Sequence, residues 1–416
     1  MNRKLVGVVL GAMFAAGCLP RPATPTPTPT PTATPPPVVG PQIAYVGNDG
    51  AIWVEDLESG ASQRLSAPGV VTFSASPPFW SPDGEWLAYV QGGNPWEPGN
   101  AVFVVEASGG EPRKVGEGYA PAWSPDGSRL YFMSNFVQSE QQMEQTLFAA
   151  EVGSWEPQAL ATQVWFSGLW PVEKVVVSPQ GDRLAVYASG LEAEGALLLA
   201  RADGSQVREI GDPKRDFVYT ADNFDWAPDG KRLVYRDSGD PFVGGEEPSL
   251  KIIDPVTQET IVMMPDDGFW PRWSPDGERI LTATFGVDSG FTVALRTPEG
   301  DSIGRYDERT FGDIWGARPS WSPDSSRFLF IARMDANGDG QFDLSDPESE
   351  VWVISRDLAE ARTGARGIAP TAVWSPDGSQ IAIAMGEQGA RTLWVVNADG
   401  SGLRQVADGD QPAWRP

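Results

Sequence analysis

Short apolar stretches alternate with polar turns along most of this chain. The apolar stretches are rich in β-branched and aromatic residues, and they follow a Ser-Pro-Asp-Gly segment or a close variant of it. Proline presets φ and glycine accepts a left-handed conformation, so such a segment turns the chain tightly into a strand. The pattern predicts strands at 87–90, 130–133, 184–187, 233–236, 280–284, 328–332 and 381–385.

The turn segment is part of a longer repeat that usually begins with tryptophan. Full, variant or truncated copies begin at Trp80, Trp123, Val177, Trp226, Trp273, Trp321, Trp374 and Trp414. Successive copies lie 40 to 54 residues apart, which suits a four-stranded propeller blade with loops of varying length. The repeat therefore predicts an all-β propeller, in which the recurring tryptophan packs between blades.

The two ends of the repeat region are incomplete in complementary ways. Residues 43–46, 52–54 and 63–65 match the second, third and fourth strands of a blade, but no first strand precedes them. Residues 411–414 match a first strand with nothing after it. Pairing these ends would close a ring and remove exposed sheet edges. We expect eight blades closed by the N- and C-terminal strands, with seven blades as the alternative if one unit is degenerate.

The repeated Trp-Ser-Pro-Asp-Gly copies, in register with the strand pattern, make the region from Ile43 to Trp414 resemble the TolB-type, WD-repeat-like propeller family. The resemblance implies a propeller whose rim binds another protein. Histidine is absent from all 416 residues, which removes the base of Ser-His-Asp and Cys-His mechanisms and the imidazole of the usual zinc sites. We therefore expect a protein-binding scaffold that is not an enzyme.

The N-terminus has the pattern of a bacterial export signal. Arg3 and Lys4 precede an apolar stretch at 5–16, and small residues lead to Cys18, which is the single cysteine of the chain. This arrangement resembles a lipoprotein lipobox, which implies removal of residues 1–17 and lipidation of Cys18. An ordinary signal peptide cleaved at a nearby small residue is the alternative. We expect an extracytoplasmic protein whose lipid anchors it to the cell membrane or the outer membrane.

A proline-rich segment separates the expected anchor from the repeats. Residues 20–37 are almost entirely proline, threonine and alanine, a composition that favours extended polyproline II and cannot bury a core. We therefore predict an anchor and stalk at 18–40 and a propeller at 41–416. The net charge of −25 repels phosphate backbones and anionic lipids, which argues against nucleic acid as a partner and leaves the lipid as the membrane contact.

Acidic and aromatic residues gather in the segments that lead into the first strands, which share one rim in a propeller. Acids and aromatics together suit a carbohydrate or peptide groove. The candidate binding residues are Trp165, Trp170, Asp222, Asp225, Asp266, Asp267, Trp270, Asp313 and Trp315. Because carboxylate pairs can cleave glycosides without histidine, a carbohydrate-binding or carbohydrate-cleaving propeller is the second functional hypothesis. For any single residue the alternative is structural, with acids capping turns and aromatics packing between blades.

One segment interrupts the repeat after the predicted strand at 328–332. It follows the D-x-[DN]-x-[DN]-G pattern of calcium loops and keeps an acid at its ninth position. The pattern predicts one structural Ca²⁺ ion, with ligands from Asp335, Asn337, Asp339, Gln341, Asp343 and Asp346. Asp346 stands where such loops usually have a bidentate glutamate, and the alternative is an acidic, glycine-rich solvent loop.

Overall fold

The computed structural model describes residues 40–69, 77–92, 99–135, 137–138, 143–165, 169–190, 195–210, 222–237, 248–265, 268–286, 290–308, 318–333, 348–368 and 370–416. Contacts divide the chain into Met1–Val39 and Gly40–Pro416, and the described residues belong to the second unit. Their regular secondary structure consists of β-strands, which confirms the predicted all-β class. The described residues include no apolar helix of membrane-spanning length.

Five antiparallel sheets have four strands each, in chain order. Their strands are β4 (Phe79–Trp80), β5 (Trp86–Gln91), β6 (Ala101–Glu106) and β7 (Arg113–Glu117); β13 (Leu169–Val177), β14 (Arg183–Gly190), β15 (Gly195–Arg201) and β16 (Arg208–Glu209); β17 (Phe224–Trp226), β18 (Leu233–Asp237), β19 (Ser249–Ile253) and β20 (Thr260–Pro265); β21 (Phe269–Trp273), β22 (Ile280–Gly286), β23 (Gly290–Arg296) and β24 (Ser302–Glu308); β25 (Ser320–Trp321), β26 (Arg327–Arg333), β27 (Glu348–Ser355) and β28 (Glu360–Ile368). A sixth sheet adds a short strand to this plan. Its strands are β8 (Tyr119–Trp123), β9 (Arg129–Met133), β10 (Val137–Gln138), β11 (Met143–Glu151) and β12 (Pro157–Trp165).

The remaining sheet joins the two ends of the described chain. Its order is β29 (Thr371–Trp374), β30 (Gln380–Met385), β31 (Thr392–Asn397), β32 (Arg404–Trp414), β1 (Gln42–Gly47), β2 (Ile52–Asp56) and β3 (Ala61–Arg64). The first part of β32 pairs with β31, and its last part pairs with β1, where Ile43 lies opposite Trp414. β32 is thus the outer strand of one four-stranded unit and the innermost strand of the next.

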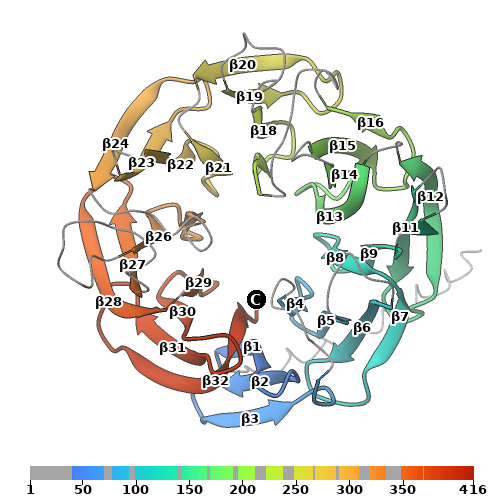
Figure 1. The fold of residues 1–416 in the computed structure, drawn as a ribbon, viewed down its shortest axis with the longest axis horizontal. Helices are drawn as coiled ribbons and strands as arrows, with labels where there is room; N and C mark the ends of the chain where they lie inside the picture. Colours follow the sequence, from blue (N-terminus) through green and yellow to red (C-terminus); the bar gives the residue numbers. More distant parts are fainter. Residues whose placement is uncertain are drawn as a thin grey trace, which may run out of the picture. The chain divides into compact units, whose positions relative to one another are not determined.

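Counted in this way, the strands of the described residues form eight four-stranded units. Figure 1 shows these units following one another around a ring, with β32 beside β1. The closed eight-blade ring stays a prediction that a truncation tests below.

Hydrogen bonds within each Ser-Pro-Asp-Gly turn explain why the segment recurs. In the first copy the Ser81 hydroxyl accepts the backbone N–H of Trp86 at 2.9 Å, and the backbone N–H of Gly84 donates to the Ser81 carbonyl at 2.8 Å. Gly84 has a φ of 69°, which glycine adopts without steric strain. The same serine bond recurs at Ser124, Ser178, Ser274, Ser322 and Ser375. The turn therefore sets the register in which the second strand returns along the first.

The recurring tryptophans link neighbouring sheets. Trp123 Nε1 donates to the carbonyl of Phe79 in the preceding sheet at 3.1 Å, and Trp80 Nε1 donates to the Ala413 carbonyl at 2.9 Å. Equivalent bonds are made by Trp321, Trp374 and Trp414. In contrast, Nε1 of Trp226 and of Trp273 has no hydrogen-bond partner among the described residues, and Val177 replaces the tryptophan of β13. The link is therefore missing between β8 and β13, between β13 and β17, and between β17 and β21.

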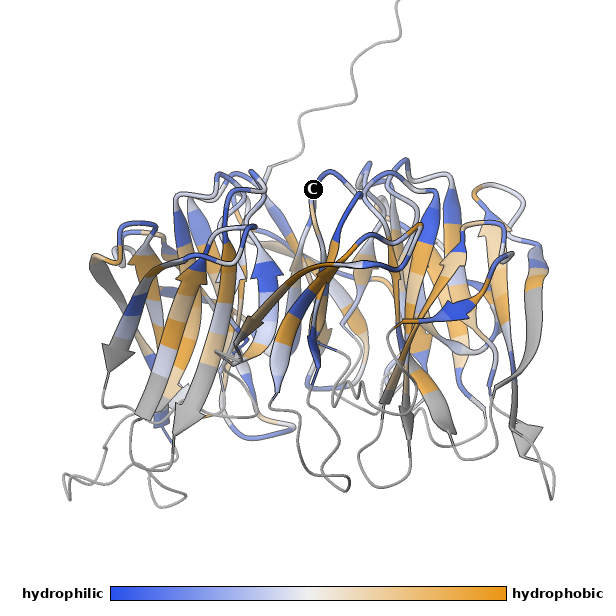
Figure 2. Ribbon diagram, turned by 90° about the horizontal axis from the view of Figure 1, so that it is seen from above, coloured by the Kyte–Doolittle hydropathy of each residue, from blue (hydrophilic) through white to orange (hydrophobic). Residues whose placement is uncertain are grey.

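Hydrophobic clusters fill the spaces between adjacent sheets. In one of them, Leu281 and Val293 pack with Phe328, Phe330 and Trp352 of the next sheet. Figure 2 shows apolar residues along the middle of the strands and polar residues at the turns. Each sheet is thus stabilised mainly by its two neighbours, as expected for a repeat architecture.

The ring has two rims that differ in the course of the chain. Each innermost strand begins at one rim, which we call the leading rim, and ends at a Ser-Pro-Asp-Gly turn on the other, which we call the turn rim. β32 ends at Trp414, so the C-terminus marks the turn rim in Figure 2. β1 is antiparallel to β32, and its first residue, Gln42, accepts a hydrogen bond from Arg415 at 2.8 Å. The described chain therefore also begins at the turn rim.

Candidate functional site

Three cationic side chains surround one buried carboxylate near the innermost strands of four consecutive sheets. Lys174 Nζ lies 2.7 Å from Asp222 Oδ1. Arg318 Nη1 lies 2.8 Å from Asp222 Oδ2, and Arg272 Nη2 lies 3.7 Å from Asp222 Oδ1. Lys174 belongs to β13 and Arg272 to β21, whereas Asp222 and Arg318 lie just before β17 and β25. We call these four residues the Asp222 cluster.

Backbone contacts hold the cluster in place. Arg272 Nη1 donates to the carbonyls of Asp222 at 2.8 Å, of Pro271 at 2.9 Å and of Phe224 at 3.4 Å. The Asn223 side-chain oxygen accepts the backbone N–H of Trp270 at 3.0 Å. These bonds join the start of β17 to β21, where the tryptophan links are missing. Because its Nη1 is committed to carbonyl groups, Arg272 is a positioning residue rather than an open binding group.

The charges of the cluster do not balance. Burial raises the pKa of Asp222, but the three surrounding cations outweigh burial and lower that pKa to about 2. Asp222 is therefore ionised at neutral pH, and the cluster carries two surplus positive charges. The side chains of Arg318 and Lys174 are 62% and 37% exposed, whereas that of Asp222 is 9% exposed. Lys174 and Arg318 are thus exposed to solvent, whereas the Asp222 carboxylate that they contact is buried.

A second carboxylate adjoins the cluster. Burial raises the pKa of Asp225, and the charge of Arg272 acts in the opposite direction. An Asp225 carboxylate oxygen accepts the backbone N–H of Trp273 at 2.8 Å. Asp225 therefore helps to join β17 to β21.

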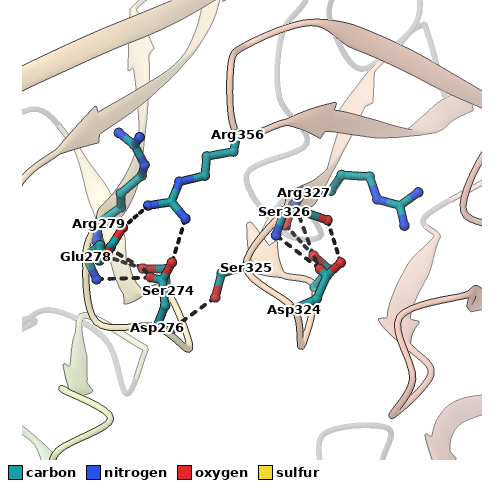
Figure 3. A network of polar contacts seen from close by, with 10 residues as sticks. Ser274, Asp276, Glu278, Arg279, Asp324, Ser325, Ser326, Arg327 and Arg356 are labelled. Carbon is teal, nitrogen blue, oxygen red and sulfur yellow. Dashed lines mark hydrogen bonds and ion pairs between the residues drawn. The ribbon is translucent and has the colours of Figure 1, made fainter.

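One group of charged residues at the turn rim shows the opposite charge balance. Arg356 is paired with both Asp276 and Glu278, at 2.6 Å and 2.5 Å (Figure 3). The backbone N–H of Asp276 also donates to the Ser325 hydroxyl at 3.0 Å, and this contact links two adjacent turns. One cation is shared by two carboxylates here, whereas three cations share one carboxylate in the Asp222 cluster.

A cleft of about 510 Å³ also lies at the turn rim, between the turns at 124–129 and 179–181. Arg129 and Glu151 both line it, and they pair with each other at 2.6 Å. The Asp126 carboxylate accepts hydrogen bonds from Ser124 and Ser128, which lower its pKa to about 2. Because these polar groups already bind one another, they are less available to a ligand than the exposed cations of the Asp222 cluster.

The structure places only some of the predicted rim residues. It brings Asp222 and Asp225 together beside Arg272, as described above. Trp270 is 7% exposed and packs in the hydrophobic cluster between its sheet and the next, which is the structural role that the sequence left open. Trp165 and Trp170 belong to β12 and β13, but their side chains lie outside the described part of the chain. Also outside the described residues are Asp266, Asp267, Asp313 and Trp315.

The lipid and metal predictions fall on other parts of the chain. Cys18 and the predicted calcium loop from Asp335 to Asp346 lie outside the described residues. The residues that are described contain no group of three or more acidic or cysteine side chains placed to hold a metal ion. Lipidation and calcium binding therefore stay predictions.

The sequence reasoning missed the three cations of the cluster because it considered only acids and aromatics near the first strands. A signal was present in the repeat itself. Arg318 stands three residues before Trp321, Lys174 three residues before Val177, and Arg272 directly before Trp273. Aligning the copies on their first residue would have placed these cations near one another.

Comparison with known sequences does not identify the family of this chain. No family model matches the chain. An uncharacterized protein of Agrobacterium fabrum is 25% identical over 194 residues, which are 46% of this chain and 59% of that protein. The chain thus spans about three fifths of the length of this relative.

Comparison with solved structures identifies the fold. The dihydro-heme d1 dehydrogenase NirN superposes with a TM-score of 0.60 and 13% identity, covering 90% of this chain and 74% of that one. The structure of the Dos1 propeller gives a TM-score of 0.55 and 12% identity, covering 84% and 86%. This fold is a β-propeller.

The likeness shows the fold of this propeller but not its function. TolB from Acinetobacter baumannii aligns over 88% of this chain and 79% of its own with 15% identity, but its TM-score of 0.40 is too low to support a conclusion about this chain. The neighbours include an enzyme, NirN, so the fold does not decide whether this propeller is catalytic.

Proposed function

We propose that this chain is a lipid-anchored β-propeller of the cell envelope that binds a protein partner at its leading rim and carries out no catalysis. The Asp222 cluster is the observation that carries the proposal. It presents surplus positive charge to solvent in a protein of net charge −25. Charge complementarity of this kind steers a partner and fixes its orientation.

The rim at which the described chain begins supports partner binding at the leading rim. Gln42 lies next to Arg415 at the turn rim. A stalk at 18–40 that is lipidated at Cys18 would therefore join the propeller at the turn rim. The Asp222 cluster belongs to the leading rim, because Asp222 and Arg318 lie just before β17 and β25 begin.

The chemistry of the two described rim acids supports binding over catalysis. Asp222 is enclosed by cations, and a pKa of about 2 keeps it ionised near neutral pH, so it is no proton donor there. Asp225 accepts a backbone N–H bond within the sheets. Neither carboxylate has the open position that an acid–base pair for glycoside cleavage requires.

Crosslinking in intact cells tests the proposal. The full-length protein, Arg318→Glu and Arg356→Glu are expressed in the host, crosslinked with formaldehyde, purified and quantified by mass spectrometry. Both arginines pair with aspartate, but they belong to opposite rims, so the two charge reversals are matched. We expect the partner to be retained with Arg356→Glu and lost with Arg318→Glu.

The same crosslinked proteins in all three samples, or loss with Arg356→Glu alone, would contradict binding at the leading rim. A glycan array distinguishes protein binding from the second hypothesis, a carbohydrate-binding or carbohydrate-cleaving propeller. Tight binding of a defined sugar by the propeller would favour the carbohydrate function instead.

A further inference from the structure

We infer that the Asp222 cluster binds a carboxylate group of its ligand, held between Lys174 and Arg318 on the solvent side of Asp222. This inference rests on the proposed function for the place of binding, and it adds the chemistry that is recognised there.

The donors of the two exposed cations are only partly used. In the described part of the chain, Lys174 and Arg318 each pair with Asp222 and with no other carboxylate. An ammonium group has three N–H donors and a guanidinium group has five. One contact to Asp222 therefore leaves further donors on both side chains for an oxyanion from solution.

The two cations are also held in a fixed relation to each other. They contact the two different oxygens of one carboxylate, at 2.7 Å and 2.8 Å. Asp222 is buried and anchored next to β17, so it holds both cations close together at little further cost in side-chain entropy when a ligand arrives. A single incoming carboxylate is small enough to contact Lys174 and Arg318 at the same time.

The charge of the whole protein favours a ligand with little charge of its own. Each additional negative charge on a ligand is repelled by a surface of net charge −25. Salt screens that repulsion beyond about 8 Å, so contact with the cluster decides the binding of a small group. A carboxylate carries one charge and matches the planar fork of arginine, whereas a phosphate monoester carries nearly two. A carboxylate is therefore the better match.

Titration with small defined probes tests the inference. The probes are N-acetyl-Gly-Asp-Gly-amide, its asparagine counterpart and inorganic phosphate, each titrated into the full chain and followed by ligand-observed NMR. We expect the aspartyl peptide to bind, to weaken as NaCl is added, and to exceed both other probes.

Variants assign the binding to the cluster. Arg318→Gln and Lys174→Gln should each weaken binding of the aspartyl peptide by about fivefold, the size of one solvent-exposed charge contact. Asp222→Asn should strengthen binding by a similar factor, because it removes the carboxylate that competes for the same cations. Arg356→Gln, at the other rim, should leave the affinity unchanged. Circular dichroism verifies folding. If Asp222→Asn fails to fold, Arg318→Gln and Lys174→Gln still test whether the aspartyl peptide binds at the cluster.

Three outcomes would overturn the inference: equal binding of the asparagine peptide, tighter binding of phosphate, or weaker binding in Asp222→Asn despite a native circular dichroism spectrum. If no probe binds while the crosslinks in cells still depend on Arg318, the carboxylate chemistry is wrong and the proposed function stands.

Discussion

The Asp222 cluster should stabilise the fold as well as form a site, and Asp222→Asn measures how much. The substitution keeps the shape of the side chain and removes its charge. The pKa of Asp222 is about 2 in the folded protein, against an ordinary value of 3.8 for aspartate. Each pH unit of that difference is worth about 1.4 kcal/mol, so at neutral pH the charge of Asp222 contributes about 2 kcal/mol to the free energy of unfolding. Lys174 and Arg318 are exposed enough to be solvated in the variant, so we expect no large further loss.

The pH dependence has a definite sign. The folded-state pKa is depressed, so the contribution is fully present well above pH 3.8 and is lost as the pH falls through the folded pKa of about 2. The difference in unfolding free energy between wild type and Asp222→Asn should therefore be about 2 kcal/mol at pH 6 and about half of that at pH 3.

Urea unfolding followed by tryptophan fluorescence provides the assay. Glu299→Gln, which removes an exposed carboxylate from the turn after β23, is the matched control and should change the stability by less than about 0.5 kcal/mol. A difference below about 0.5 kcal/mol for Asp222→Asn at pH 6, or one that is the same at pH 6 and pH 3, would refute the reasoning.

Three further predictions concern the ends of the chain and the predicted metal loop. Removing residues 411–416 deletes Ala413 and Trp414, two of the four β32 residues paired with β1, and should lower the melting temperature by more than about 5 °C; an unchanged melting curve would rule out ring closure. Cys18→Ser should move the protein from the membrane fraction to the soluble fraction, and a variant that stays with membranes would rule out lipid anchoring at Cys18. Calorimetry of the chelator-stripped protein should detect one Ca²⁺ site with a Kd of about 10⁻⁴ to 10⁻³ M, and Asp335→Ala with Asp339→Ala should abolish it; no heat in the wild type up to several millimolar would mean that the loop binds no calcium.

The turns and the strands that follow them could be predicted from the sequence because their determinants are local. The predicted strand at 130–133 is β9 (Arg129–Met133), and that at 381–385 is β30 (Gln380–Met385). The serine hydroxyl of each of these two turns accepts the backbone hydrogen bond from the residue at the start of the strand. The contact between the chain ends was predictable for a different reason, since an unmatched strand at each end leaves two sheet edges that favour pairing.

The packing of Trp270 could not be predicted in this way. Its position before Pro271 looks like that of a rim aromatic, but its backbone has a φ of 56°. Ala120 and Gln411 share this left-handed φ before a proline, and the strand register shifts at all three places. Such a bulge redirects the side chain, and the Trp270 ring lies in the cluster between two sheets.

The Asp222 cluster depends on contacts that no local pattern records. Lys174 and Arg318 reach the same carboxylate from sheets on either side of it, and they are far apart in the sequence. In the sequence they read as ordinary solvent-facing charges. Only the curvature of the ring, which brings the innermost strands together, makes them partners of Asp222.

The central claim is that the leading rim holds a carboxylate at the Asp222 cluster, and crystallography with 4-bromobenzoate tests it most directly. The bromine locates the bound molecule by anomalous scattering. We expect its carboxylate within hydrogen-bond distance of both Lys174 Nζ and the Arg318 guanidinium. A molecule bound beside Arg356 at the turn rim, or no ordered molecule at a concentration that saturates binding in solution, would contradict the claim.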